Sequence, residues 1–142
     1  MHTLITIILV SIFLSISGIH FYWAFGGVWG TKAVFPTKAD SGEMTFQPPF
    51  LATIVVALGL MVMAWTTSAL NGLLTFPLSE AWIQGIMIGI ATIFAIRAIG
   101  DFKYAGLFKK VKNTAFGIND TRYYTPLCLL ISTLSITLLW LN

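Results

Sequence analysis

The chain has 142 residues, of which 57% are hydrophobic and only 9% are charged. This balance excludes a water-soluble domain, because so small a protein could not bury that much apolar surface. The formal net charge is +3, but the basic residues lie beside the ends of apolar stretches, so no nucleic-acid partner is expected. Cys128 is the single cysteine, which excludes an intrachain disulfide and a two-cysteine redox motif.

Four uncharged apolar stretches follow one another along the chain and are long enough to cross a membrane. A membrane span needs about 18 to 25 mostly apolar residues to match the roughly 30 Å hydrocarbon layer of a bilayer. We therefore predict helices over about residues 3–25, 50–75, 80–100 and 124–141. The predicted fold class is all-α, an integral membrane four-helix bundle, in which residues 1–142 form a single domain.

The distribution of basic residues predicts how the bundle is oriented. Lys32 and Lys38 lie between the first two spans, and the residues between the third and fourth spans include Lys103, Lys109, Lys110, Lys112 and Arg122. The turn at 75–80 and the two termini have no lysine or arginine. Because these residues accumulate on the cytoplasmic side of membrane proteins, we predict cytoplasmic long loops and an N-out/C-out topology.

Proline marks the predicted starts of two helices. Pro48 and Pro49 precede the second span, and Thr125 and Pro126 stand at the predicted start of the fourth. The missing N–H of proline breaks no hydrogen bond in the first turn of a helix. A threonine side chain can also accept a hydrogen bond from a free N–H at a helix start. We therefore predict Thr125 as the cap of a helix that begins at about residue 124.

Small residues recur every four positions on the third predicted helix. They are Ala81, Gly85 and Gly89, and such spacing lets two helix backbones approach closely in a membrane. The favoured interpretation is packing within the bundle. The alternatives are a homodimer through Gly85 and Gly89, or the docking of a partner helix on the same residues.

The segment after the third span has an amphipathic pattern. If it were a helix, the apolar residues Tyr104, Leu107, Phe108 and Val111 would share one side. The opposite side would carry Lys103, Lys109, Lys110 and Lys112. A helix of this kind lies on the membrane surface, with its lysines beside anionic lipid headgroups. A solvated loop is an equal alternative, because Gly106 weakens a helix.

Polar and aromatic residues concentrate where the first and third spans end and the fourth begins. The first and third spans run in the same direction, so their C-terminal ends share one membrane face. The residues placed there at about one depth are His20, Trp23, Trp29, Arg97, Asp101 and Tyr124. We predict a ligand site with Arg97 as the anion anchor and His20 as a hydrogen-bond partner. Trp23 and Trp29 would form its aromatic walls.

Arg97 and Asp101 are four residues apart on one predicted helix and can therefore form an ion pair. The negative end of the helix dipole lies at the helix C-terminus and repels a carboxylate there. Asp101 is therefore expected to have a specific cationic partner. The two candidates are Arg97 and Lys103. The favoured interpretation of the Arg97–Asp101 pair is a structural one.

His20 is the ionisable residue of the first span, and histidine can exchange protons near neutral pH. A hydrogen bond to a neighbouring helix is the more common role for such a residue. His2 and His20 are 18 residues apart on one helix. That separation is about 27 Å and excludes a shared metal or haem, so no cofactor is expected. No aspartate or glutamate lies in the middle of a span, which disfavours a proton-coupled pump.

Three segments together resemble a known family. They are residues 20–30 (HFYWAFGGVWG), 97–104 (RAIGDFKY) and 124–129 (YTPLCL). These segments resemble small bacterial four-helix membrane proteins that are classed as a domain of unknown function. The resemblance covers nearly the whole chain and implies a multi-pass protein of the bacterial cytoplasmic membrane. It implies no activity, substrate or catalytic residue.

The sequence leaves three functions open. The favoured one is a non-enzymatic membrane protein that binds or moves a small amphiphilic or anionic ligand at the predicted site. The first alternative is a membrane enzyme acting on a lipid or isoprenoid, with His20 as acid and base and Arg97 stabilising negative charge. The second alternative is an accessory subunit of a membrane complex, docked through Gly85 and Gly89.

Overall fold

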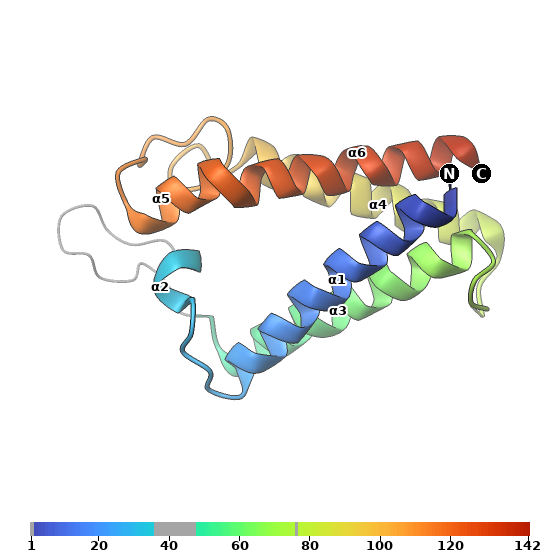
Figure 1. Cartoon of the computed structure of the whole chain (residues 1–142), viewed down its shortest axis with the longest axis horizontal. Coiled ribbons are helices and arrows are strands. Elements are labelled where there is room, and N and C mark those ends of the chain that lie inside the picture. Colours follow the sequence, from blue (N-terminus) through green and yellow to red (C-terminus); the bar gives the residue numbers. More distant parts are fainter. Residues whose placement is uncertain (1, 36–47, 76) are drawn as a thin grey trace.

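The computed structural model describes residues 2–35, 48–75 and 77–142, and its helices form an elongated bundle (Figure 1). The first three long helices are α1 (His2–Ala24), α3 (Phe50–Leu70) and α4 (Glu80–Ile99). The fourth long stretch consists of α5 (Ala115–Asn119), the π-helix η1 (Asp120–Tyr124) and α6 (Thr125–Leu141). A short helix, α2 (Thr31–Val34), follows α1.

All regular secondary structure in the described residues is helical, and four helical stretches are long and apolar enough to cross a membrane. The predicted all-α fold class is therefore confirmed, and the chain is a multi-pass membrane protein. Both chain ends lie at one end of the bundle, which we call the terminal end (Figure 1). The other end, where α1 and α4 finish and α5 begins, is called the basic end. The cellular side of each end stays a prediction.

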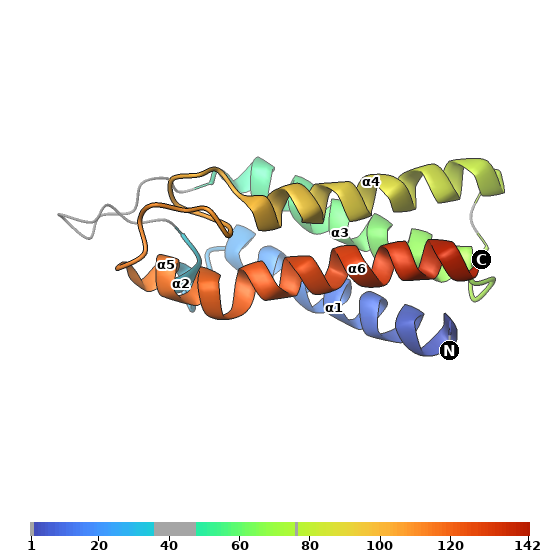
Figure 2. The same ribbon diagram turned by 90° about the horizontal axis from the view of Figure 1, so that it is seen from above.

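The four long helices pack as two pairs, α1 with α3 and α4 with α6. The pairs lie together near the terminal end and diverge toward the basic end (Figure 1), and Figure 2 shows the same helices from above. A buried serine joins the helices of each pair. The Ser17 hydroxyl donates to the Ala57 carbonyl, and the Ser132 hydroxyl donates to the Ala91 carbonyl, each over 2.8 Å. Such bonds stabilise helix pairs in lipid, where the hydrophobic effect does not hold helices together.

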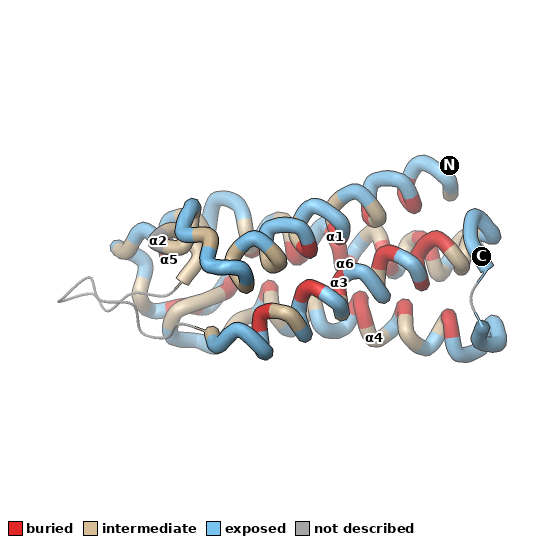
Figure 3. The backbone as a smooth tube through the Cα atoms, turned by 90° about the horizontal axis from the view of Figure 1, so that it is seen from below, coloured by how far each residue is buried: buried red, intermediate tan, exposed pale blue. Residues whose placement is uncertain are grey.

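The core lies between the two pairs and is made of aliphatic side chains and Phe13. Its fully buried members include Leu9, Phe13, Met87, Ile131 and Leu138. Large apolar side chains such as Leu4, Val55 and Ile93 are exposed on the outside of the bundle. Figure 3 shows buried positions recurring along each long helix between exposed ones. This pattern suits a bundle surrounded by lipid, in which exposed apolar residues carry no cost.

Two predicted helix boundaries differ from the structure. α3 begins after Pro49 as predicted but ends at Leu70 rather than at residue 75. Gly72 has φ +66, and the Leu73 N–H returns to the Ser68 carbonyl over 3.0 Å, which closes the helix end.

The fourth helical stretch begins at Ala115, well before the predicted start. Its cap is Thr114, whose side chain accepts a hydrogen bond from the Gly117 N–H over 3.0 Å. The prediction that Thr125 caps this helix is therefore wrong. Pro126 is accommodated because it stands in the first turn after the π-helix, where the hydrogen-bond register changes and the missing N–H breaks few bonds.

The glycines of α4 face outward. Gly85 is exposed, Gly89 is half-buried, and a Cβ atom added to either would meet nothing within 4 Å. The interpretation that this stripe packs within the bundle is therefore wrong. The homodimer and the partner helix stay predictions.

Candidate functional site

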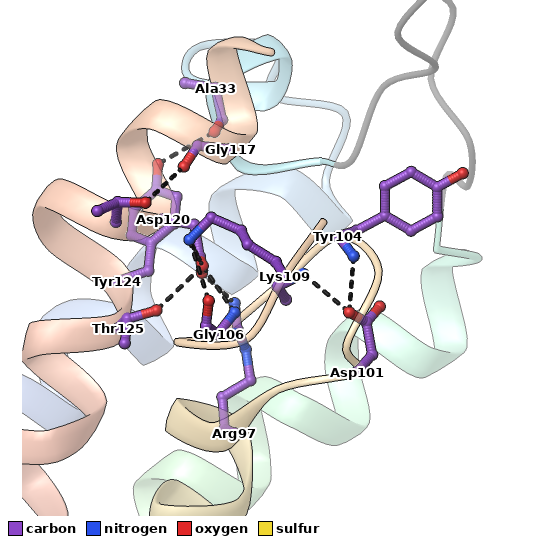
Figure 4. A network of polar contacts seen from close by, with 12 residues as sticks. Ala33, Arg97, Asp101, Tyr104, Gly106, Lys109, Gly117, Asp120, Tyr124 and Thr125 are labelled. Atoms are coloured by element: carbon purple, nitrogen blue, oxygen red, sulfur yellow. Dashed lines mark hydrogen bonds and ion pairs between the residues drawn. The ribbon is translucent and has the colours of Figure 1, made fainter. Parts of the chain in front are cut away.

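A buried carboxylate organises the basic end of the bundle (Figure 4). Asp120 lies in η1, and none of its surface is exposed. Its Oδ1 accepts a hydrogen bond from Arg97 Nη2 over 3.0 Å. Its Oδ2 accepts from Lys109 Nζ over 2.9 Å, from the Gly106 N–H over 2.8 Å and from the Thr125 hydroxyl over 3.0 Å. Four donors thus hold one carboxylate that joins α4, the following loop and the fourth span. We call these residues the Asp120 cluster: Arg97, Gly106, Lys109, Asp120 and Thr125.

The loop after α4 reaches Asp120 because it folds back on itself. Gly100 and Gly106 have φ values of +91 and +87, a region that favours glycine. The two glycine backbones lie so close that an added Cβ on either would collide with the other segment. The Leu107 N–H then donates to the Ala98 carbonyl over 2.9 Å, which fixes the returning chain beside the last turn of α4.

The two cations around Asp120 are not equivalent. The Lys109 side chain is 3% exposed, and its ammonium group bonds to Asp120 and to the Gly106 carbonyl. The Arg97 side chain is 37% exposed, and its Nη1 makes no hydrogen bond within the described residues although that atom is buried. Two cations face one carboxylate, so the cluster carries an excess of one positive charge. Arg97 is the member with donors left over, because a guanidinium has five N–H groups.

The predicted Arg97–Asp101 pair is wrong, because Arg97 binds Asp120 instead. α4 ends at Ile99, and Gly100 turns the chain, so Asp101 is no longer on the same helix face as Arg97. Asp101 Oδ1 accepts the backbone N–H groups of Lys103, Tyr104 and Ala105 over 2.7–3.0 Å. Asp101 therefore stabilises the loop through its backbone. Its oxygen accepts the Lys103 N–H, and no bond to the Lys103 ammonium group is present among the described residues.

The Asp101 carboxylate makes the stability of the fold depend on pH. Burial acts to raise the pKa of Asp101, but the N–H donors of Ala105, Lys103 and Tyr104 outweigh it and hold that pKa below its usual range. A lowered pKa in the folded state stabilises the fold above the unfolded value of about 3.9. This contribution is lost as the pH falls through the folded pKa.

We expect Asp101→Asn to remove that acid-sensitive contribution. The thermal midpoint of the variant should therefore fall less between pH 6 and pH 3 than the midpoint of the wild type. Circular dichroism of both proteins in detergent at each pH provides the measurement. Identical acid slopes for the two proteins would contradict this account of Asp101.

His20, Trp23 and Trp29 form a second group at the end of α1. His20 Nδ1 donates to the Ile16 carbonyl of its own helix over 2.8 Å, and its ring meets Trp23 edge-on with centroids 5.2 Å apart. Trp23 Nε1 donates to the Trp29 carbonyl over 2.8 Å. The three residues therefore stabilise the turn after α1.

Trp29 lines an open groove on the outward face of α1. The groove has a volume of about 470 Å³, and its other lining residues are Ser15, Gly18, Ile19 and Tyr22. None of these residues belongs to the Asp120 cluster. The described contacts therefore separate the predicted aromatic walls from the predicted anion anchor.

Tyr124 connects the two halves of the chain at the basic end. Its hydroxyl donates to the Ala33 carbonyl of α2 over 3.3 Å (Figure 4), and its ring lies 6.1 Å from that of Phe116. Tyr124 follows Asp120 by one helical turn. Of the predicted site residues, Arg97 and Tyr124 thus lie around Asp120, while His20, Trp23 and Trp29 lie at the end of α1.

The loop at 103–112 is irregular, so the predicted amphipathic helix is not formed. Lys109 is buried against Asp120 and is therefore not available to lipid headgroups. Lys103, Lys110 and Lys112 are exposed. Within residues 2–35, 48–75 and 77–142, no three histidine, cysteine, aspartate or glutamate side chains are grouped so that they could hold a metal ion.

Sequence reasoning missed Asp120 and the role of Lys109. One signal was available, because Asp120 precedes an apolar span by a single turn and a carboxylate there needs a partner. The partners of Asp120 are brought to it when the loop after α4 folds back, and no local sequence pattern predicts that contact.

A comparison with protein families gives a match that includes the residues around Asp120. A family model described as a protein of unknown function (DUF3995) matches residues 13–135. The chain belongs to this family. The match runs from the middle of α1 into α6 and includes Arg97, Lys109 and Asp120. It confirms the predicted resemblance to a family of unknown function. No curated protein and no solved structure matches the chain.

Proposed function

We propose that the protein binds or moves a small anionic amphiphile, whose charged head is held by Arg97 at the basic end. The proposal places the protein in a bacterial cytoplasmic membrane with its basic end toward the cytoplasm. The observation that carries it is the state of Arg97. Asp120 fixes one guanidinium nitrogen, and the other terminal nitrogen is buried and makes no hydrogen bond within the described residues, while over a third of the whole side chain is exposed.

The charge of the cluster supports an anionic ligand. Lys109 alone would neutralise Asp120, so Arg97 adds a positive charge that has no counterpart in the cluster. An arginine fork matches the geometry of a carboxylate or phosphate group, and a bond to Asp120 holds the fork in one orientation. Asp120 is thus a positioning residue for Arg97 in this proposal.

The surroundings of Arg97 support a ligand with an apolar tail. Ile93 lies one helical turn before Arg97 on α4, and both Ile93 and Ile96 are exposed. A molecule with its charged head at Arg97 would therefore have an apolar helix surface beside its tail. The same surface faces lipid in the membrane, which gives an amphiphile a direct route to the site.

Mass spectrometry of small molecules that co-purify with the protein tests this function. We expect an anionic compound to be retained by the wild type and lost from Arg97→Gln. Arg122→Gln is the matched control, because it removes the same charge from an exposed arginine whose guanidinium lies over the Tyr123 ring. If Arg97→Gln is folded and retains the same compounds as the control, the proposal is wrong.

The outward stripe on α4 favours a second candidate, an accessory subunit of a membrane complex. Gly85 and Gly89 leave room for the backbone of another helix, because nothing in the described chain occupies that space. Loss of a specific co-purifying protein on Gly85→Leu, with unchanged folding, would support this candidate. Retention of that protein would contradict it.

A further inference from the structure

We infer that residues 102–108 form a membrane-seated loop, which inserts Phe102 and Phe108 among the lipids at the basic end and binds anionic headgroups through the neighbouring lysines. The partner is the anionic leaflet of the bilayer around the bundle. This inference does not rest on the proposed ligand of Arg97, because it concerns different side chains.

The loop lies beside the end of α4. The hydrogen bond from the Leu107 N–H to the Ala98 carbonyl and the close contact of Gly106 with Gly100 bring the loop back to the last turn of α4. That turn is the end of a membrane span. Residues beside it lie at the level where acyl chains meet headgroups.

The loop exposes large apolar side chains. Phe102 is 58% exposed and Phe108 is 62% exposed, and their rings stack with centroids 6.2 Å apart. Leu107 between them in the chain is also exposed. Aromatic and aliphatic side chains beside a span end are stabilised by partition into the interface.

The backbone at Phe102 has an unusual conformation. Phe102 has φ +61, and it is the one non-glycine residue of the described chain with a positive φ. A bulky residue in this region is strained, and such strain persists only where the surroundings impose it. The N–H bonds to Asp101 and the glycine contact impose it here, and the result is an aromatic ring held outward.

The charges beside the aromatic pair indicate which lipids the loop meets. Lys103 lies in the loop, Lys110 and Lys112 follow it, and all three are exposed. The buried Lys109 is already neutralised by Asp120. Each exposed lysine near an anionic surface adds electrostatic attraction to it. If the loop bound a partner protein instead, that protein would cover Phe102 and Phe108, and their rings would not contact lipid.

Site-directed spin labelling measures where the loop lies. The buried Cys128 is first replaced by alanine, and a nitroxide is attached at Phe108→Cys or, as a second site, at Leu107→Cys. The full chain is reconstituted in vesicles of equal parts phosphatidylcholine and phosphatidylglycerol. Asn113→Cys is the control label, because Asn113 is exposed on the same loop beyond the aromatic pair.

We expect labels at 107 and 108 to be several-fold more accessible to oxygen than to a water-soluble nickel chelate. The label at 113 should show the opposite preference. We also expect the difference to shrink in pure phosphatidylcholine and after Lys103, Lys110 and Lys112 are all changed to glutamine. Nickel accessibility at 107 and 108 equal to that at 113 would overturn the inference. A label inaccessible to both reagents would indicate a protein contact and would overturn it as well.

Discussion

Asp120→Ala is expected to destabilise the fold by about 3–5 kcal/mol, because it leaves the ammonium group of Lys109 buried without a counter-ion. The same change removes the acceptor of the Gly106 N–H and of the Thr125 hydroxyl. The loop after α4 should lose its attachment to the fourth span. Chemical unfolding in mixed micelles, followed by circular dichroism, measures the free energy of unfolding.

Two further variants separate buried charge from other effects of the Asp120 substitution. Asp120→Asn combined with Lys109→Met removes both charges of the buried pair and should recover much of the lost stability. Asp101→Ala removes an exposed carboxylate from the same end and should cost much less. If Asp120→Ala is no more destabilising than Asp101→Ala, the Asp120 cluster does not hold the basic end together.

Gly100→Ala is expected to destabilise the protein by about 2–5 kcal/mol, from combined backbone strain and overlap. Gly100 has φ +91 and ψ −173, a conformation that alanine adopts only under strain. Its added Cβ would also overlap the Ala105 carbonyl oxygen. The loop must open to relieve this overlap, which would withdraw Gly106 and Lys109 from Asp120. The free energy of unfolding of the variant in micelles tests this prediction.

Gly85→Ala is the matched control for Gly100→Ala. Its Cβ would point into open space on a regular helix, where alanine is favoured over glycine by about 0.5–1 kcal/mol. We therefore expect a small gain in stability. Equal losses from the two substitutions would contradict the loop geometry. A loss at Gly85 alone, accompanied by weaker self-association, would instead support the homodimer through Gly85 and Gly89.

The four spans were predictable from the sequence because each depends on a continuous apolar run. Which side of each span faces the core, and which faces outward, was not predictable from the sequence. Gly85 and Gly89 were placed inside the bundle by their spacing, yet they face outward. In lipid, both the core side and the outer side of a helix are apolar, so spacing shows which residues share a face but not where that face points.

The Asp120 cluster was unpredictable for a different reason. The pairing of Arg97 with Asp101 assumed that α4 continues past Gly100, and the lysine face of residues 103–112 assumed a helix. Both assumptions fail because Gly100 and Gly106 fold the chain back on itself. That closure brings Lys109 to Asp120 and leaves Asp101 to bind the loop backbone. Two glycines six residues apart do not reveal such a contact in sequence alone.

The proposed function depends on one claim, that Arg97, positioned by Asp120, binds an anionic headgroup. Native mass spectrometry of the protein released from nanodiscs, with phosphatidylglycerol as the probe, compares the affinity of Arg97→Gln with that of Arg122→Gln. The two variants have the same net charge, so they separate a specific contact from general electrostatic attraction. We predict that Arg97→Gln weakens binding by about tenfold, corresponding to about 1.4 kcal/mol, and that Arg122→Gln changes it little. Equal affinities for the two variants would contradict the claim.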